Sequence, residues 1–342
     1  MHIDLQVQRS ARAAIVQDEL GRVGVPAPGI ESNVSGQVLQ YRAKARVAVV
    51  AKQRGILSGF RAMGSHRIVP VETCLVLAPV LDHMRVELTS WLEGSVGVGE
   101  ASIYKSRGGL PAVHLAWNGS LSSRVFAFAQ KQIEQGRWGG ACVFLDGASA
   151  PAVLGNPTGA TEGVDGIDLF FPPGGFIQAN ETMNRSLVQY VDTLSGIDGK
   201  PTLELFAGSG NFTIALAGRT SELEAVEQNA LAVDAARGNL ERRGLKARMR
   251  LGDASGSDFC VRNAVRTVVL DPPRAGARVA VERIVESRVR KVVMVSCDPA
   301  TFSRDVSILY HRGRFEIERL AVFEMFPCTS HVETVALLRR DR

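Results

Sequence analysis

The sequence lacks the features that build disulfide frameworks, zinc sites and membrane spans. Its 342 residues include only five cysteines, an odd number without a CxxC pair, at Cys74, Cys142, Cys260, Cys297 and Cys328. This usage argues against a disulfide framework and a self-contained zinc site, and it fits a reducing compartment. No apolar run reaches the length of a membrane span, and the N-terminus is not a hydrophobic leader. We therefore expect a cytoplasmic protein with no membrane anchor and no bound metal.

Acidic residues are missing from one long stretch. Between Tyr41 and Arg67 the chain has seven Lys or Arg residues and no Asp or Glu, within a net charge of +5. The segment from Tyr41 to Val47 alternates strictly, which places Arg42, Lys44 and Arg46 on one face of a strand. Their spacing of roughly 6–7 Å matches successive phosphates of a nucleic acid. The run is either a merely solvated face or a phosphate-binding surface, and we expect these three cations to contact RNA.

The length allows two domains. Residues 5–24 have a helical pattern, and a Pro/Gly/Ser/Asn-rich connector covers 26–36. A basic hairpin, further strands and a Ser-capped helix over 120–135 follow, and Pro172-Pro173-Gly174-Gly175 then breaks the pattern. We predict an N-terminal helix and connector over 1–36 and a mixed, largely antiparallel α+β domain over 37–172. A third region covers 173–342.

That third region alternates strand and helix. Apolar runs at 202–206, 222–226, 266–270 and 292–296 alternate with helical stretches at 211–218, 229–243, 279–288 and 300–310, and late strands follow at 315–323 and 332–338. This order predicts an α/β fold, a doubly wound parallel sheet with a C-terminal hairpin-like addition. Ligands of such sheets bind at the carboxyl ends of the strands.

The first predicted strand runs into a glycine turn that lacks one glycine of a dinucleotide site. Gly208 and Gly210 are present, but Thr213 stands where the third glycine would be, which disfavours a pyrophosphate cradle. Glu227 follows the second strand, where a carboxylate can accept hydrogen bonds from both hydroxyls of a ribose. A turn of this kind suits S-adenosylmethionine better than NAD. The alternative for Glu227 is a solvated charge at the end of a strand.

Three more polar groups stand at the ends of predicted strands. Asp253 can reach an adenine or simply stabilise a turn, whereas Asp271 is held by the two prolines that follow it. Cys297 ends an apolar strand and precedes a helix start with proline, so it is either a nucleophile or a small buried hydrophobe. Glu333 interrupts an apolar strand, where a carboxylate is either used chemically or protects a sheet edge.

Five motifs together resemble the S-adenosylmethionine-dependent RNA uracil-C5 methyltransferases. They are FxQxN at 176–180, ELFAGSGNF at 204–212, DPPR at 271–274, SCDP at 296–299 and HxE at 331–333. The resemblance implies a Rossmann-like methyltransferase domain over 173–342, with the 37–172 domain binding RNA. It also implies S-adenosylmethionine as the cofactor and C5 of a uridine in ribosomal or transfer RNA as the methylated atom.

The resemblance assigns roles to individual residues. Cys297 matches the nucleophile that adds to C6 of uracil, and Glu333 matches the base that removes the C5 proton. The residues assigned to the cofactor are Gln178, Phe206, Asn211 and Glu227, to which the strand-end argument adds Gly208, Asp253 and Asp271. Gln178 and Asp271 also match contacts to the target base. Phe176 is expected to stack on that base once it leaves its helix.

The motifs are closest to the ribosomal-RNA members, many of which carry an N-terminal β-barrel and a cysteine-ligated iron–sulfur cluster. Here the chain begins after both, and Cys74 alone cannot supply four ligands, so we expect no cluster. We also expect a monomer. Two alternatives stay open on the residues: an amino-group RNA methyltransferase of the same fold, which needs no thiol, and a non-catalytic RNA-binding protein. The sequence does not indicate which RNA or which uridine is modified.

Overall fold

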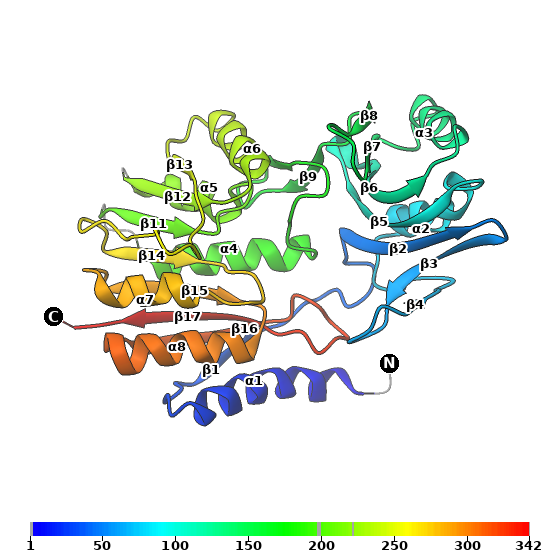
Figure 1. The fold of residues 1–342 in the computed structure, drawn as a ribbon. Helices are drawn as coiled ribbons and strands as arrows, with labels where there is room; N and C mark the ends of the chain where they lie inside the picture. Colours follow the sequence, from blue (N-terminus) through cyan, green and yellow to red (C-terminus); the bar gives the residue numbers. More distant parts are fainter. Residues whose placement is uncertain (1–2, 197–199, 221, 342) are drawn as a thin grey trace. The chain divides into compact units, whose positions relative to one another are not determined.

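A computed structural model describes residues 3–196, 200–220 and 222–341, which form two compact units (Figure 1). The eight-stranded unit comprises Met1–Gly36, Gly163–Ile167 and Thr182–Arg342. The seven-stranded unit comprises Gln37–Glu162 and Asp168–Glu181. Within the described residues, no helix combines the length and apolarity needed to cross a membrane.

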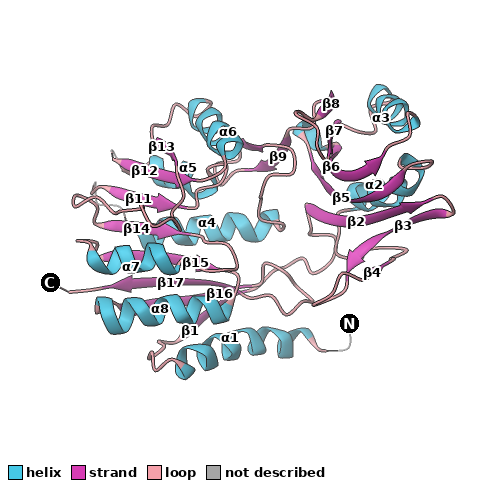
Figure 2. Cartoon of the chain, in the orientation of Figure 1, coloured by secondary structure: helices cyan, strands magenta, loops and turns pink. Residues whose placement is uncertain are grey.

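The eight-stranded sheet has the order β1-β16-β17-β15-β14-β11-β12-β13 (Figure 2). Its strands are β1 (Ile30–Asn33), β11 (Thr202–Leu205), β12 (Leu223–Glu227), β13 (Arg248–Leu251), β14 (Thr267–Leu270), β15 (Lys291–Ser296), β16 (Glu316–Phe323) and β17 (Glu333–Arg339). Strands β11 to β15 are parallel, and β17 runs antiparallel between β15 and β16. The predicted doubly wound sheet with a C-terminal hairpin is therefore confirmed.

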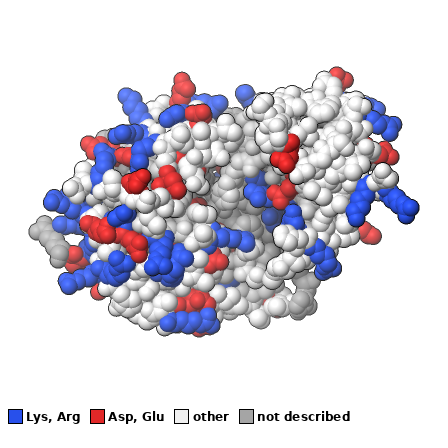
Figure 3. All heavy atoms as spheres, viewed as in Figure 1, with Lys and Arg blue, Asp and Glu red and all other residues white. Residues whose placement is uncertain are grey.

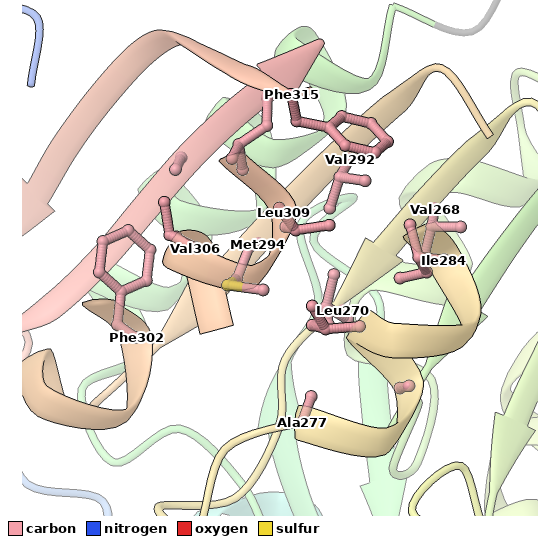
Figure 4. Packing of buried hydrophobic residues seen from close by; sticks show 14 of the residues in the cluster. Val268, Leu270, Ala277, Ile284, Val292, Met294, Phe302, Val306, Leu309 and Phe315 are labelled. Carbon is pink, nitrogen blue, oxygen red and sulfur yellow. The ribbon is translucent and has the colours of Figure 1, made fainter. Parts of the chain in front are cut away.

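Both faces of this sheet are buried by helices, which explains why its central strands are continuous apolar runs. One face packs against α1 (Leu5–Arg22), α7 (Arg278–Glu286) and α8 (Pro299–Gly313). The residues of this core that Figure 4 labels include Val268, Leu270, Val292 and Met294 from the strands and Ile284, Val306 and Leu309 from the helices. The other face packs against α4 (Glu181–Ser195), α5 (Asn211–Ala217) and α6 (Ala230–Glu241). Strand side chains alternate between these two cores.

The seven-stranded sheet has the order β4-β3-β2-β5-β6-β7-β8, with one parallel pair, β6 and β7. Its elements are β2 (Lys44–Lys52), β3 (Gly55–Arg61), β4 (Ile68–Val69), α2 (Pro79–Trp91), β5 (Val96–Lys105), the 3₁₀ turn η1 (Arg107–Gly109), β6 (Pro111–Ser120), α3 (Arg124–Glu134), β7 (Gly140–Leu145) and β8 (Ala152–Gly155). A separate ribbon pairs β9 (Gly159–Glu162) with β10 (Asp168–Phe171). The fold agrees with the expected mixed, largely antiparallel α+β domain.

The structure differs from the sequence expectations at three places. The helix expected over 120–135 begins at Arg124, because Ser120 extends β6 and pairs with Val96. Residues 1–36 belong to the eight-stranded unit, since β1 pairs with β16. The segment that carries FxQxN belongs to the seven-stranded unit, where the amide of Ala43 donates to the carbonyl of Ala179 at 2.7 Å.

Candidate active site

The polar residues predicted at strand ends follow four strands of one sheet. Glu227 ends β12, Asp253 follows β13, Asp271 follows β14 and Cys297 follows β15. These strands are parallel, so their carboxyl ends meet at the same edge of the sheet. The eight-stranded unit thus presents one thiol and three carboxyl groups along that edge.

Glu333 joins this edge from the opposite chain direction. Strand β17 is antiparallel to β15, and the last pair in the ladder joins Ser296 to Thr334. Cys297 follows Ser296 and Glu333 precedes Thr334, and the charge of Glu333 raises the pKa of the Cys297 thiol, so the two groups lie near each other. The Glu333 side chain is only 2% exposed, and within the described part of the chain its Oε1 has no hydrogen-bond partner. A buried, unpartnered carboxyl oxygen is costly unless it serves a purpose.

Burial raises the pKa of both Cys297 and Glu333. Burial raises the pKa of the Cys297 thiol to about 11, with further increases from Glu333 and Asp271 and an opposing effect of Arg274. Burial, followed by repulsion from Asp271, raises the pKa of Glu333 well above its usual value. Glu333 is therefore a stronger base, once ionised, than an exposed glutamate.

Two neighbours of this pair were not singled out by the sequence reasoning. Arg274 is the last residue of DPPR, and its Nη2 lies 3.4 Å from Nδ1 and 3.3 Å from Nε2 of His331, the first residue of HxE. The cation of Arg274 stabilises a thiolate at Cys297, as its lowering effect on the pKa of that thiol indicates. The sequence indicated Arg274 and His331 only as members of the DPPR and HxE motifs. Their contact depends on the tertiary structure, so the sequence could not show it.

The glycine turn after β11 has the backbone of a ligand-binding loop. Gly208 and Gly210 have φ values of 54° and 94°, and Phe206 adopts 62°, a left-handed conformation that non-glycine residues rarely take. A Cβ added at Gly208 would meet no described atom within 4 Å, so space lies open beside the turn. This residue set fits a nucleoside cofactor bound without a phosphate cradle.

Side chains around the turn are held in place. The carboxylate of Glu227 accepts from the amides of Gly208 at 2.9 Å and Asn229 at 2.8 Å. Asn211 exchanges two side-chain hydrogen bonds with Asn184, of 3.0 and 2.8 Å. The fixed carboxylate suits the ribose hydroxyls that the sequence predicted for Glu227.

The remaining predicted residues lie in the seven-stranded unit. Gln178 is buried, whereas Phe176 is 70% exposed and therefore accessible for stacking. The three cations do not share one environment: the Arg46 side chain is 68% exposed, but Lys44 is only 8% exposed. The Lys44 ammonium donates to the carbonyls of Gly174, at 3.2 Å, and Gly175. RNA contact by Arg42 and Arg46 stays a prediction, whereas the loop before Phe176 covers Lys44 and occupies its ammonium group.

Comparison with known proteins agrees with the motifs. A family model described as tRNA (uracil-5-)-methyltransferase matches residues 167–248 and 244–341. A protein of Halomonas elongata named 23S rRNA (uracil(1939)-C(5))-methyltransferase RlmD is 33% identical, covering 98% of this chain and 73% of its own. The protein of the same name from Nitrosococcus oceani is 31% identical, covering 100% and 79%.

A solved structure shares the fold. The crystal structure of Pyrococcus abyssi tRNA (uracil-54, C5)-methyltransferase in complex with S-adenosyl-L-homocysteine superimposes with a TM-score of 0.77 at 23% identity, over 98% of this chain and 84% of that one. The family model and the curated relatives establish that the chain belongs to the tRNA (uracil-5-)-methyltransferase family and is an S-adenosylmethionine-dependent RNA methyltransferase.

Proposed function

We propose that the protein methylates C5 of a uridine in RNA through a covalent bond between Cys297 and C6 of the uracil. The observation that carries this proposal is that Cys297 and Glu333 adjoin the last pair of the β15–β17 ladder and interact electrostatically. Glu333 is a buried carboxyl group with an oxygen that has no hydrogen-bond partner among the described residues. Uracil C5 is a weak nucleophile, so it needs electron density supplied from a neighbouring atom before it can accept a methyl group. A thiolate at C6 supplies that density.

The chemistry balances with these two residues. The Cys297 thiolate forms a bond to C6, and the C5–C6 π electrons move towards O4 to give an enolate. Bound S-adenosylmethionine would supply the methyl group that C5 then accepts. The Glu333 carboxylate takes the C5 proton, the C5–C6 double bond re-forms, and the Cys297 thiolate leaves. Arg274 favours the thiolate at the start and the end of this cycle.

Other residues bind the reactants in this proposal. Phe206, Gly208, Asn211, Glu227 and Asp253 hold the cofactor, while Gln178 and Asp271 contact both cofactor and target base. Phe176, with its exposed ring, stacks on the flipped base. Arg46, which is exposed beside Glu100, contacts an RNA phosphate.

For the substrate, we favour ribosomal RNA over transfer RNA. The curated relatives that align over nearly the whole chain at 31–33% identity bear names of 23S rRNA methyltransferases. We also propose a cytoplasmic monomer, since RNA of this kind is modified in the cytoplasm and one chain supplies both Cys297 and Glu333.

The test compares wild-type protein with Cys297→Ala on transcribed 23S rRNA and on transcribed tRNA. We expect wild type to form 5-methyluridine in the ribosomal transcript, detected by nucleoside mass spectrometry. Cys297→Ala should lose at least about 10³-fold in rate while binding S-adenosylhomocysteine normally in calorimetry. Methylation by Cys297→Ala at the wild-type rate would eliminate the covalent route, and methylation of the tRNA alone would reverse the substrate assignment.

A further inference from the structure

Helix α1 carries a buried cation that meets a buried anion next to the active-site hairpin. Arg12 is 4% exposed and Glu324, the residue after β16, is 2% exposed. The Arg12 Nη1 donates to Glu324 Oε1 at 3.0 Å, and Arg9 Nε donates to Oε2 at 3.1 Å. The amide of Ser35 also donates to Oε2, at 3.0 Å. Both oxygens of the Glu324 carboxylate are therefore satisfied by groups from the N-terminal segment.

The Arg12 guanidinium also contacts the loop between β16 and β17, which we call the 324–332 loop. Arg12 Nη2 lies 3.4 Å from the carbonyl oxygens of both Phe326 and Thr329. Thr329 Oγ1 donates to the Phe326 carbonyl at 2.8 Å and accepts from the amide of His331 at 3.3 Å. Arg12 thus fixes one side of a turn in which Cys328 holds a left-handed φ of 65°.

This loop leads directly to the catalytic carboxyl group. Glu333 directly follows the loop and pairs with Phe323, which directly precedes it, so both ends of the loop are anchored in the hairpin. His331 packs on Phe326 with ring centroids 5.5 Å apart and contacts Arg274. A change in the turn at Thr329 would therefore displace both His331 and Glu333.

We propose that Arg12 is a positioning residue of the reaction: by holding the 324–332 loop it places Glu333 to remove the C5 proton. This inference rests on the proposed role of Glu333. It gives α1 a function in the chemistry beyond covering the sheet through Val16 and Leu20. Arginine suits this position because one planar group reaches a carboxylate and two carbonyls together.

The variants separate positioning from folding. Arg12→Met leaves Glu324 buried with one cation fewer, a change that can unfold a protein, whereas Arg12→Met/Glu324→Met removes both charges. Arg12→Lys keeps the charge but its single ammonium cannot hold both the carboxylate and the carbonyls. Arg22→Ala is the matched control, since Arg22 lies on the same helix, is 70% exposed and forms an ion pair with Glu19, three residues away.

The readout is the covalent complex on a 23S rRNA transcript with ordinary uridine. If proton removal is impaired, the methylated Cys297 adduct accumulates and becomes visible as an SDS-stable protein–RNA band. For the double variant and Arg12→Lys we expect turnover to fall by about 10- to 100-fold, with that band increased and the KM for S-adenosylmethionine within about twofold of wild type. Arg22→Ala should behave as wild type.

Two results would overturn the inference. One is wild-type turnover in both Arg12 variants. The other is an equal loss of turnover and of adduct formation on 5-fluorouridine RNA, because that adduct forms without proton removal and its loss indicates general damage. Failure of the proposed function is distinct, since the wild-type protein itself would then form no adduct on 5-fluorouridine RNA.

Discussion

The Cys297 thiol is difficult to ionise in its buried position, but it lies near a cation that favours the thiolate. Its pKa of about 11, raised by burial and by two nearby carboxyl groups, keeps the thiol protonated at neutral pH in the protein without substrate. The thiolate, once formed, retains the high nucleophilicity of a weakly acidic thiol. Arg274 lowers the pKa of the Cys297 thiol and so offsets part of the free-energy cost of forming the thiolate. This gives the last residue of DPPR a chemical role.

Glu204, in strand β11, is another buried carboxyl group. Its side chain is 1% exposed, and burial raises its pKa to about 8. A raised pKa in the folded state contributes stability below the unfolded value of about 4.5, and this contribution is lost as pH rises through about 8. Glu204 therefore makes the fold less stable at neutral pH than at mildly acidic pH.

We predict that Glu204→Gln removes this pH dependence. Between about pH 5 and about pH 8 the wild type should lose roughly 4 kcal/mol of unfolding free energy relative to the variant. Urea denaturation of both proteins across this range measures the difference. Parallel stability curves would show that Glu204 is ionised in the folded protein. Glu224→Gln is a useful comparison, since Glu224 is also buried but pairs with Arg250 and Arg262.

At the scale of elements, two of the cations on strand β2, Lys44 and Arg46, have different environments. Arg46 is exposed, whereas Lys44 is covered by the loop before Phe176, and burial lowers the pKa of Lys44 to about 8. On the face shown in Figure 3, Lys and Arg side chains of the eight-stranded unit are interspersed with Asp and Glu. The RNA contact proposed for strand β2 therefore rests on the exposed side chain of Arg46.

We predict that Arg46→Ala and Lys44→Met affect RNA binding differently. Arg46→Ala should weaken binding and reduce the slope of log affinity against log salt by about one unit. Lys44→Met should leave that slope unchanged, because its ammonium is occupied by the carbonyls of Gly174 and Gly175. Filter binding to a 23S rRNA transcript between low and high salt makes the comparison. A reduced slope in Lys44→Met would mean that the loop opens to expose this lysine.

Elements with strong apolar patterns were predictable from the sequence, and those made by tertiary pairing were not. The apolar run at 266–270 became β14 (Thr267–Leu270), because a strand buried on both faces is apolar throughout. Strand β1 has the polar sequence Ile-Glu-Ser-Asn and forms by pairing with β16. Helix α2 had a readable signal in Pro79 at its start and Leu81, Met84 and Leu88 at helical spacing, but the sequence reasoning passed over it.

In the candidate site, too, the residues fixed by local patterns were predictable and those fixed by tertiary contacts were not. Cys297, Asp271 and Glu227 were predictable because strand ends are fixed by the strands themselves. The burial of Lys44 depends on a segment 130 residues away, and the Arg12 contact to Glu324 spans 312 residues, so neither is visible in local patterns. Sequence periodicity reports which face a residue occupies but not what covers that face.

At the scale of the whole molecule, the chain joins two units that carry different candidate residues. The eight-stranded unit contains Cys297, the proposed base Glu333 and the glycine turn, and α1 together with β1 is part of it. The seven-stranded unit contains Phe176, Gln178 and the cationic strand. Family membership fixes the methyl donor and the RNA substrate class, while the covalent route through Cys297 is the central claim that remains to be measured.

The most direct measurement is trapping on RNA that contains 5-fluorouridine. Fluorine at C5 cannot leave as a proton, so the account predicts that wild-type protein and S-adenosylmethionine form a stable adduct. Peptide mass spectrometry should locate this adduct at Cys297. Cys297→Ala should form none, and Glu333→Gln should form it as readily as wild type. Methylation of ordinary RNA by a wild-type protein that forms no adduct, or an adduct at another residue, would contradict the account.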